Sequence, residues 1–155
     1  PKQDAKYEFL DIMTRRLKKL GSSDQRALVV GDLNVGHRTL DIRNWKGNLK
    51  NSGFLTEERA YFDTWMGNED SKDYNTGSAG RWVDVGRAFH GDVEGPYSWW
   101  SWRGQAFDND TGWRIDYHLA NAPLAGAVTN YRVERAASYD TRWSDHAPVI
   151  ADYDI

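Results

Sequence analysis

The chain has 155 residues, of which 39% are hydrophobic and 14% aromatic, enough for one ordinary globular domain with a buried core. The formal net charge of −3 excludes a global basic field, so any contact with nucleic acid must be local. The lack of cysteine excludes disulfides and Cys-based zinc sites. No apolar run reaches the length of a membrane span and no signal-peptide pattern is present, so we expect a cytoplasmic protein without membrane contact.

The first part of the chain predicts two helices and one buried strand. Apolar residues recur three or four apart over residues 4–20, which predicts an amphipathic helix. The β-branched run at residues 27–30 predicts a strand buried on both faces. The irregular polar stretch at residues 35–53 predicts a functional loop, and a second helix is expected over residues 57–66 with Thr56 as its N-cap.

The second part of the chain predicts mainly strands. Turn-forming residues dominate residues 67–80, which we expect to be a mobile surface insertion. A short strand or turn and then a helical turn should follow. Strands are expected at residues 97–103, 113–120, 127–136 and 147–155, the first two pairing antiparallel. The expected fold class is α/β (α+β), with one mixed or antiparallel β-sheet and covering helices in a single domain over residues 1–155.

The motif "GDLN" places Asp32 and Asn34 at the end of the first strand. The two side chains point the same way if the strand pleat continues to them. A carboxylate can accept a proton from water or bind a divalent cation, and an amide can donate to an oxyanion. On these four residues by themselves an Asx turn is the favoured interpretation, because Asp and Asn prefer such positions.

The motif "SDH" places Asp145 and His146 just before a predicted strand. Successive side chains on a strand diverge, so the carboxylate that orients His146 should come from elsewhere. Asp116 is the candidate, because it lies in the otherwise apolar run "RIDYHL" and needs a partner. Pairing of Asp116 with Arg114 or Arg103 is the alternative.

The segment "SWWSW" carries Trp99, Trp100 and Trp102. Tryptophan in such a segment normally belongs to the core. These three rings cannot all face one side of a strand, however, so at least one is available to stack on a base or line a sugar pocket.

Taken in order, "VVGDLNV", "DIRNWKGN", "GFLTEERAYFD", "YSWWSWRGQAFDNDTGWRIDYHLAN" and "SDHAPVIADY" resemble the exodeoxyribonuclease III family of apurinic/apyrimidinic endonucleases, in the endonuclease/exonuclease/phosphatase superfamily. The resemblance covers almost the whole chain apart from residues 67–80. It implies Mg²⁺-dependent hydrolysis of phosphodiester bonds, with Mn²⁺ as a possible substitute. The implied partner is duplex DNA, cleaved at abasic sites or 3′ termini.

The resemblance also implies roles for individual residues. Asp32 would activate the attacking water and Asn34 would steady the phosphate. Asp145, together with Asp32, would bind the metal. His146 would contact the scissile phosphate, with Asp116 as its orienting partner. Residues that would line the pocket for an extruded abasic sugar or contact the substrate are Trp99, Trp113, Ile115 and Arg114. Basic residues that could add phosphate contacts are Arg38, Arg43, Lys46, Lys50, Arg103 and Arg114.

One departure from the family is large. Members are four-layer αββα sandwiches, whose first half supplies a strand Asn, a metal-binding Glu and a Tyr. This chain matches only the second half and begins without Met, as at a cut end. We therefore expect the 155-residue chain by itself to have little or no activity, and to expose a sheet face that favours self-association.

Two other functions remain open. A superfamily phosphodiesterase or phosphatase for lipid head groups would share "GDLN" and "SDH" but would not explain "LTEER" or the tryptophans. A non-catalytic DNA-binding or dimerising module would explain the absent half but not the retained catalytic-type positions.

Overall fold

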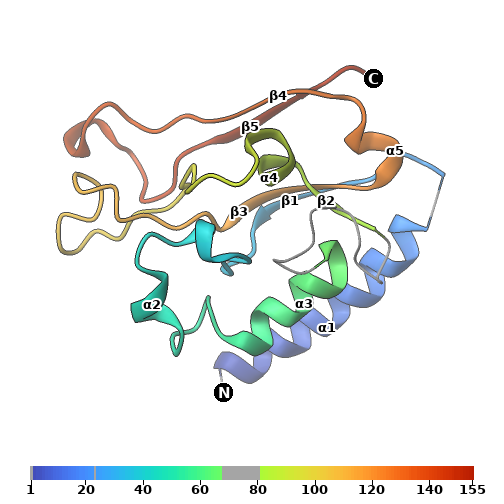
Figure 1. Cartoon of the computed structure of the whole chain (residues 1–155), viewed down its shortest axis with the longest axis horizontal. Helices are drawn as coiled ribbons and strands as arrows, with labels where there is room; N and C mark the ends of the chain where they lie inside the picture. The colour runs from blue at the N-terminus through green and yellow to red at the C-terminus, as the bar shows by residue number, and fades with distance from the viewer. Residues whose placement is uncertain (1, 23, 68–80) are drawn as a thin grey trace.

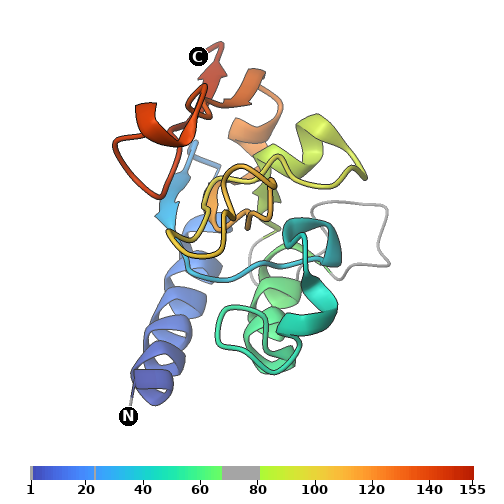
Figure 2. The ribbon, with the colours of Figure 1, turned by 90° about the vertical axis from the view of Figure 1, so that its left-hand side faces the viewer.

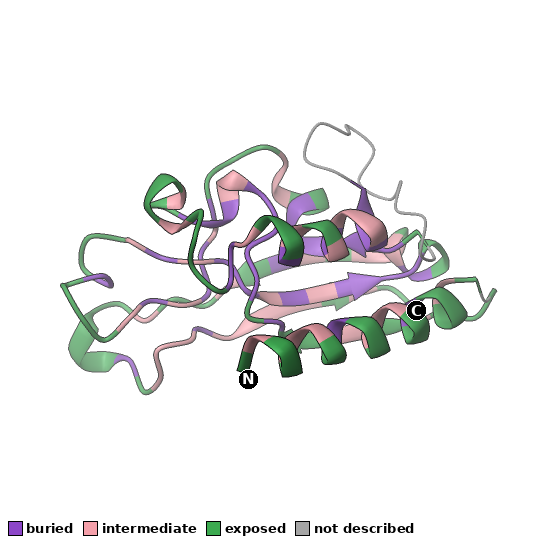
Figure 3. Cartoon of the chain, turned by 90° about the horizontal axis from the view of Figure 1, so that it is seen from below, coloured by how far each residue is buried: buried purple, intermediate pink, exposed green. Residues whose placement is uncertain are grey.

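The computed structural model describes residues 2–22, 24–67 and 81–155. Two long helices cover one face of a three-stranded antiparallel sheet, and a two-stranded antiparallel sheet lies on the other side (Figures 1 and 3). The long helices are α1 (Lys2–Gly21) and α3 (Thr56–Met66). The first sheet has the order β1 (Leu28–Asp32), β3 (Asp116–Ala120), β2 (Val83–Asp84), and the second pairs β4 (Val128–Val133) with β5 (Val149–Tyr153). Short elements are η1 (Thr39–Asp41), α2 (Trp45–Asn48), α4 (Val85–His90), α5 (Ala122–Ala125) and η2 (Tyr139–Thr141).

The helix α1 follows the predicted apolar stripe. Leu10 and Leu17 are fully buried against the core that α3 and the first sheet share. Two core tryptophans also bond to α1, because Trp65 Nε1 donates to the Thr14 hydroxyl at 2.8 Å and Trp82 Nε1 donates to a backbone carbonyl of the helix at 3.0 Å. No helix in the described part of the chain is long and apolar enough to cross a bilayer.

The start of α3 differs from the prediction. Thr56 is the first helical residue, and its side chain does not cap the helix. The carboxylate of Glu58 reaches back instead, accepting the backbone N–H of Gly53 at 2.7 Å and of Leu55 at 3.0 Å. A first-turn glutamate thus accepts N–H groups of the N-cap residue and of the loop just before the helix.

The prediction of a single sheet is wrong, because the strands form two sheets. β4 and β5 form a separate sheet, held to the first by a cluster that contains Tyr131, Val85 and Leu124. Residues 97–103 do not form a strand but make isolated bridges. The backbone N–H groups of Ser98 and Trp99 both donate to the Trp113 carbonyl, which breaks the regular ladder. We expected a surface insertion at residues 67–80. Apart from Gly67, these residues lie outside the part of the chain that the structure describes.

A buried network of two arginines and two aspartates ties the loop after β1 to α4 and to the start of β3. Asp41 accepts from Arg87 at 2.5 Å and from Arg114 at 2.8 Å, and Arg114 also contacts both oxygens of Asp84, at 2.9 and 2.5 Å. All four residues are at most 4% exposed. Burial raises the pKa of Asp41, but the two guanidinium groups lower it by more, to well below the usual range of a carboxyl group.

We expect Asp41→Asn to lower the free energy of unfolding by about 3–5 kcal/mol, because two buried guanidinium groups then lose their shared counter-charge. The matched control is Asp152→Asn, which breaks an exposed contact with Arg132 and should cost less than about 1 kcal/mol. Urea denaturation measures both.

The same network predicts the response to acid. Folding lowers the pKa of Asp41, so its stabilisation is complete where the unfolded carboxyl is ionised and declines on acidification below about pH 4. An Asp41→Asn protein that is as stable as the parent at pH 7 would contradict this account.

Candidate active site

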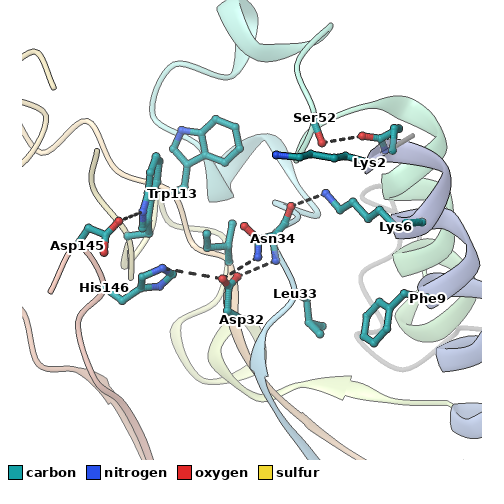
Figure 4. Close-up of a pocket in the computed structure, with 14 residues that line it drawn as sticks. Lys2, Lys6, Phe9, Asp32, Leu33, Asn34, Ser52, Trp113, Asp145 and His146 are labelled. Carbon is teal, nitrogen blue, oxygen red and sulfur yellow. Dashed lines mark hydrogen bonds and ion pairs between the residues drawn. The ribbon is translucent and has the colours of Figure 1, made fainter. Parts of the chain in front are cut away.

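A cavity of about 860 Å³ opens at the end of the sheet where β1 stops and β3 begins. The amino-terminal turns of α1 form one side, and the segments around Trp113 and His146 form the other, with Asp32 and Asn34 between them (Figure 4). The lining residues are Lys2, Gln3, Ala5, Lys6, Phe9, Asp32, Leu33, Asn34, Ser52, Trp99, Trp113, Ile115, Asp145 and His146.

Asp32 and Asn34 form a turn at the edge of this cavity. β1 ends at Asp32, and Asn34 adopts a left-handed backbone conformation with φ of 52°. The Asp32 carboxylate therefore accepts both the backbone N–H of Asn34 at 2.8 Å and its side-chain amide at 2.7 Å. The Asx turn and the cavity-facing pair, which the sequence offers as alternatives, occur together.

The pKa of Asp32 lies above the ordinary value of an aspartate. Burial raises its pKa, and the facing carboxylate of Asp116 raises it further. The hydrogen bonds from Asn34 and the nearby His146 lower the pKa of Asp32, but by less than burial and Asp116 raise it.

His146 is oriented by Asp116, not by its sequence neighbour. Its Nδ1 lies 2.9 Å from Asp116 Oδ2 and 3.1 Å from Oδ1, and its Nε2 lies 3.9 Å from Asp32 Oδ2. The side chains of His146 and Asp32 are each 32% exposed, so both reach solvent in the cavity. An imidazole held at one nitrogen by a carboxylate presents the other nitrogen in a defined direction.

Ser98 is a supporting residue that the sequence interpretation missed. This fully buried side chain donates to Asp116 Oδ2 at 2.6 Å. Its oxygen also accepts the backbone N–H groups of Ile115 and Asp116, each at 3.2 Å. The only sequence signal is a small polar residue that precedes the tryptophans of "SWW".

Asp145 faces the cavity but contacts a different residue. Its Oδ2 accepts the indole N–H of Trp99 at 3.0 Å. Trp99 packs edge-on against Trp113, with ring centroids 5.8 Å apart, and Ile115 completes this apolar wall. A Cβ atom on Gly53 would come within 2.7 Å of the Trp113 ring, so the glycine allows that ring to lie where it does.

Arg114 is not a cavity residue. Its guanidinium is 1% exposed and held by Asp41 and Asp84, so neither substrate contact nor pairing with Asp116 fits its position. The other expected basic residues also lie outside the lining, and Arg43 pairs with Glu94. Within the described lining, the lysines are Lys2 and Lys6, and Lys6 donates to the Asn34 carbonyl at 2.9 Å.

The residues present fit a divalent cation in part. Among the described residues, Asp32, Asp116 and His146 each place one potential ligand atom within 4.8 Å of the others. Carboxylate oxygens suit Mg²⁺ or Mn²⁺, although the imidazole nitrogen nearest to Asp116 is already engaged. This group shares only Asp32 with the expected metal pair, because Asp145 lies outside it.

Comparison with known proteins places this site in a family. The model of the Endonuclease/Exonuclease/phosphatase family matches residues 1–146, and the chain belongs to that family. A curated exodeoxyribonuclease of Bacillus subtilis (strain 168) is 38% identical over 128 residues, which cover 81% of this chain and 44% of the relative. A DNA-(apurinic or apyrimidinic site) endonuclease of Dictyostelium discoideum is 34% identical over 125 residues, covering 81% of this chain and 30% of the relative.

Solved structures share the fold of this chain. A 3′–5′ exonuclease (NExo) from Neisseria meningitidis superposes with a TM-score of 0.83 at 25% identity, covering 100% of this chain and 56% of that one. An AP endonuclease from Archaeoglobus fulgidus gives a TM-score of 0.75 at 24% identity, covering 96% of this chain and 53% of that one. The chain therefore spans about half the length of these solved relatives.

We expect Ser98→Ala to lower the free energy of unfolding by about 1–3 kcal/mol, because two buried N–H groups lose their acceptor and Asp116 loses a donor. The matched control in the same segment is Ser101→Ala, which removes one exposed contact to the backbone of Arg103 and should change stability little. Urea denaturation of both variants measures the difference, and equal stabilities would rule out this role for Ser98.

Proposed function

We propose that this chain carries most of the catalytic site of a DNA-repair nuclease that hydrolyses phosphodiester bonds at abasic sites and 3′ termini of duplex DNA. The observation that carries the proposal is the pairing of His146 with Asp116 opposite Asp32, beside the wall of Trp99, Trp113 and Ile115. The family membership and the similarity to an exodeoxyribonuclease and to an apurinic or apyrimidinic site endonuclease support it.

The proposed chemistry divides the work among four side chains. Water attacks phosphorus while Asp32 takes its proton, and the bond from phosphorus to the leaving sugar oxygen breaks, that oxygen taking up a proton from solvent. The Asn34 amide steadies the water or a phosphoryl oxygen. His146, held by Asp116, directs Nε2 toward a phosphoryl oxygen. The separation of 3.9 Å between His146 Nε2 and Asp32 Oδ2 lets both groups address one reacting centre.

Binding of a divalent metal ion is part of the same proposal. Mg²⁺, or Mn²⁺ in its place, would be held by carboxylate oxygens of Asp32 and Asp145 and would neutralise charge on the phosphoryl group when bound. Asp145 keeps one oxygen without the Trp99 bond, so it can turn that oxygen toward the cavity.

The apolar wall accounts for the proposed substrate. Two indole rings and Ile115 offer little hydrogen bonding to a base, whereas a deoxyribose without its base can pack against them. Lys2 on the opposite side of the cavity adds local positive charge to a chain whose formal net charge is −3, whereas the charge of the neighbouring Lys6 is paired with Glu58 at 2.6 Å.

The open face of β1 supports the proposal that this chain works with the remaining half of the fold. Side chains alternate along a strand, so Leu28, Val30 and Asp32 share the face opposite to Val29, which packs on the helix-covered core. Leu28 is 42% exposed and Val30 is 57% exposed. A second half that covers this face would also complete the metal site, so we propose that the 155-residue chain alone cleaves DNA weakly or not at all.

A chimera tests the proposed site. This chain replaces the matched part of the Bacillus subtilis exodeoxyribonuclease, whose other part then covers the open face. We expect Mg²⁺-dependent nicking of a duplex with one abasic site, and we expect His146→Ala to reduce the rate at least about 100-fold. The control is His90→Gln, because His90 lies on α4 outside the cavity lining.

Two results of this assay would contradict the proposal. One is a His146→Ala chimera that nicks as fast as its parent. The other is a chimera that does not cleave abasic DNA but hydrolyses phosphoinositides. That result would favour the alternative function, a phosphatase for lipid head groups. Strong nicking by the 155-residue chain alone would show that the other half is dispensable.

The open face also predicts self-association of the isolated chain. Val30→Lys should shift the chain toward monomer in sedimentation velocity, because a charge on the open face disfavours apolar contact. The control is Val93→Lys, an exposed valine in the loop after α4, which should leave the distribution unchanged. Equal sedimentation of Val30→Lys and the parent chain would rule out this face as the contact.

A further inference from the structure

Three side chains outside the cavity form an exposed aromatic corner, which we call the Trp102 corner: Trp102, Tyr139 and Arg142. Trp102 is 51% exposed and Tyr139 is 39% exposed, although large aromatic side chains are normally more buried. Their rings meet edge to face, with centroids 5.9 Å apart and planes at 90°. The proposed cleavage does not use them.

Arg142 holds the two rings in place. Its guanidinium carbon lies 3.8 Å from the centroid of the Trp102 ring and 4.2 Å from that of Tyr139. The residue is only 9% exposed, and its Nη1 donates to the Trp100 carbonyl at 3.3 Å. A cation packed against a ring restrains the orientation of that ring, so Trp102 is presented to solvent as a fixed surface.

The corner also carries charge, from Arg142, from Arg103 and from one carboxylate, Asp140. Nε and Nη2 of Arg142 are buried and make no hydrogen bond within the described part of the chain. The exposed Arg103 directly follows Trp102 and makes no ion pair that the structure describes. An exposed ring between two arginines is the combination with which proteins bind single-stranded nucleic acid, through stacking and phosphate contacts.

The corner lies on the two segments that form the candidate active site. Trp99 bridges to His146, and Trp100 donates its backbone N–H to the Asp145 carbonyl at 2.9 Å. The loops that continue from these segments extend from one end of the molecule, on the left in Figure 1, and face the viewer in Figure 2. Three residues span at most about 10 Å, which is the rise of about three nucleotides of a DNA strand.

We propose that Trp102 stacks on an unpaired nucleobase within about three nucleotides of the bond that the cavity addresses. Such a base occurs at a frayed 3′ end and opposite an abasic residue. This proposal rests on the proposed function for the class of substrate. Arg142 acts as a positioning residue for the ring, and Arg103 contacts the adjoining phosphate.

A nucleobase fits the corner better than an apolar protein surface does. The exposed part is one indole with a flanking tyrosine, bordered by Arg103 and by Asp140, and both of these are exposed and charged. A protein partner would have to desolvate these charges around a small apolar centre. A DNA strand instead offers a planar base for the ring and a phosphate for the arginine.

The test measures binding without cleavage. The 155-residue chain is titrated, in the absence of divalent metal, into duplexes that carry 2-aminopurine either opposite an abasic site or ten base pairs away. We expect fluorescence quenching only at the nearer position, because stacking on an aromatic ring changes that emission. Equal quenching at both positions would contradict the proposal.

Substitutions separate stacking from charge. Trp102→Ala should weaken binding about 5- to 100-fold and remove the quenching, and Trp102→Phe should restore most of both. The dependence of binding on salt concentration should stay unchanged in these two variants. Arg103→Ala should instead reduce the salt slope by about 1 while leaving the quenching in place. The matched control is Phe89→Ala, which removes an exposed aromatic ring from α4.

The outcomes distinguish this proposal from the proposed function. Normal binding and quenching by Trp102→Ala would overturn the stacking role even if the chimera cleaves abasic DNA. Loss of quenching in Trp102→Ala would support stacking even if the chimera does not cleave. A Trp102→Ala chain that binds DNA normally but sediments as a smaller species would assign the corner to protein contact and would also overturn the proposal.

Discussion

Two carboxylates face each other across the β1–β3 ladder, and the candidate site depends on how the surrounding residues accommodate their repulsion. The antiparallel register pairs Asp32 with Asp116. Asn34 donates to the first carboxylate, and Ser98 and His146 contact the second. Each acid thus has its own polar partners, and the two can remain close at the edge of a cavity. The arrangement leaves Nε2 of His146 on the side of Asp32. Both groups therefore face the same part of the cavity.

The buried arginine network supplies the rigidity that this arrangement requires. The backbone N–H of Arg114 donates to the Asp41 carbonyl at 2.8 Å, while its guanidinium is held by the Asp41 and Asp84 carboxylates. Arg114 lies two residues before Asp116, so the network fixes the start of β3 and with it the aspartate. A residue that the sequence places among substrate contacts therefore supports the site from inside the protein.

The aromatic segment serves both the site and the adjoining surface. Trp99 belongs to the cavity wall, Trp100 is buried against Phe107, and Trp102 is exposed on the Trp102 corner. The expectation that the three rings cannot share one side is confirmed. Irregular pairing, with Ser98 and Trp99 bonding to one carbonyl, sends successive tryptophans in directions that a regular strand would not produce.

The sequence by itself determined the two main helices, the position of the first strand and the chemical identity of the site residues. The expected burial of that strand on both faces is wrong, because Leu28 and Val30 are exposed. Local periodicity and short motifs carry that information, and the family resemblance that they show is confirmed. Tertiary structure decided the division into two sheets, the pairing of Asp116 with His146 and not with an arginine, the burial of Arg114 and the contribution of Ser98. These features depend on contacts between residues that lie far apart in the chain. Ser98 and Asp116 are 18 residues apart, and Asp116 and His146 are 30 apart, so no local pattern encodes which polar group meets which.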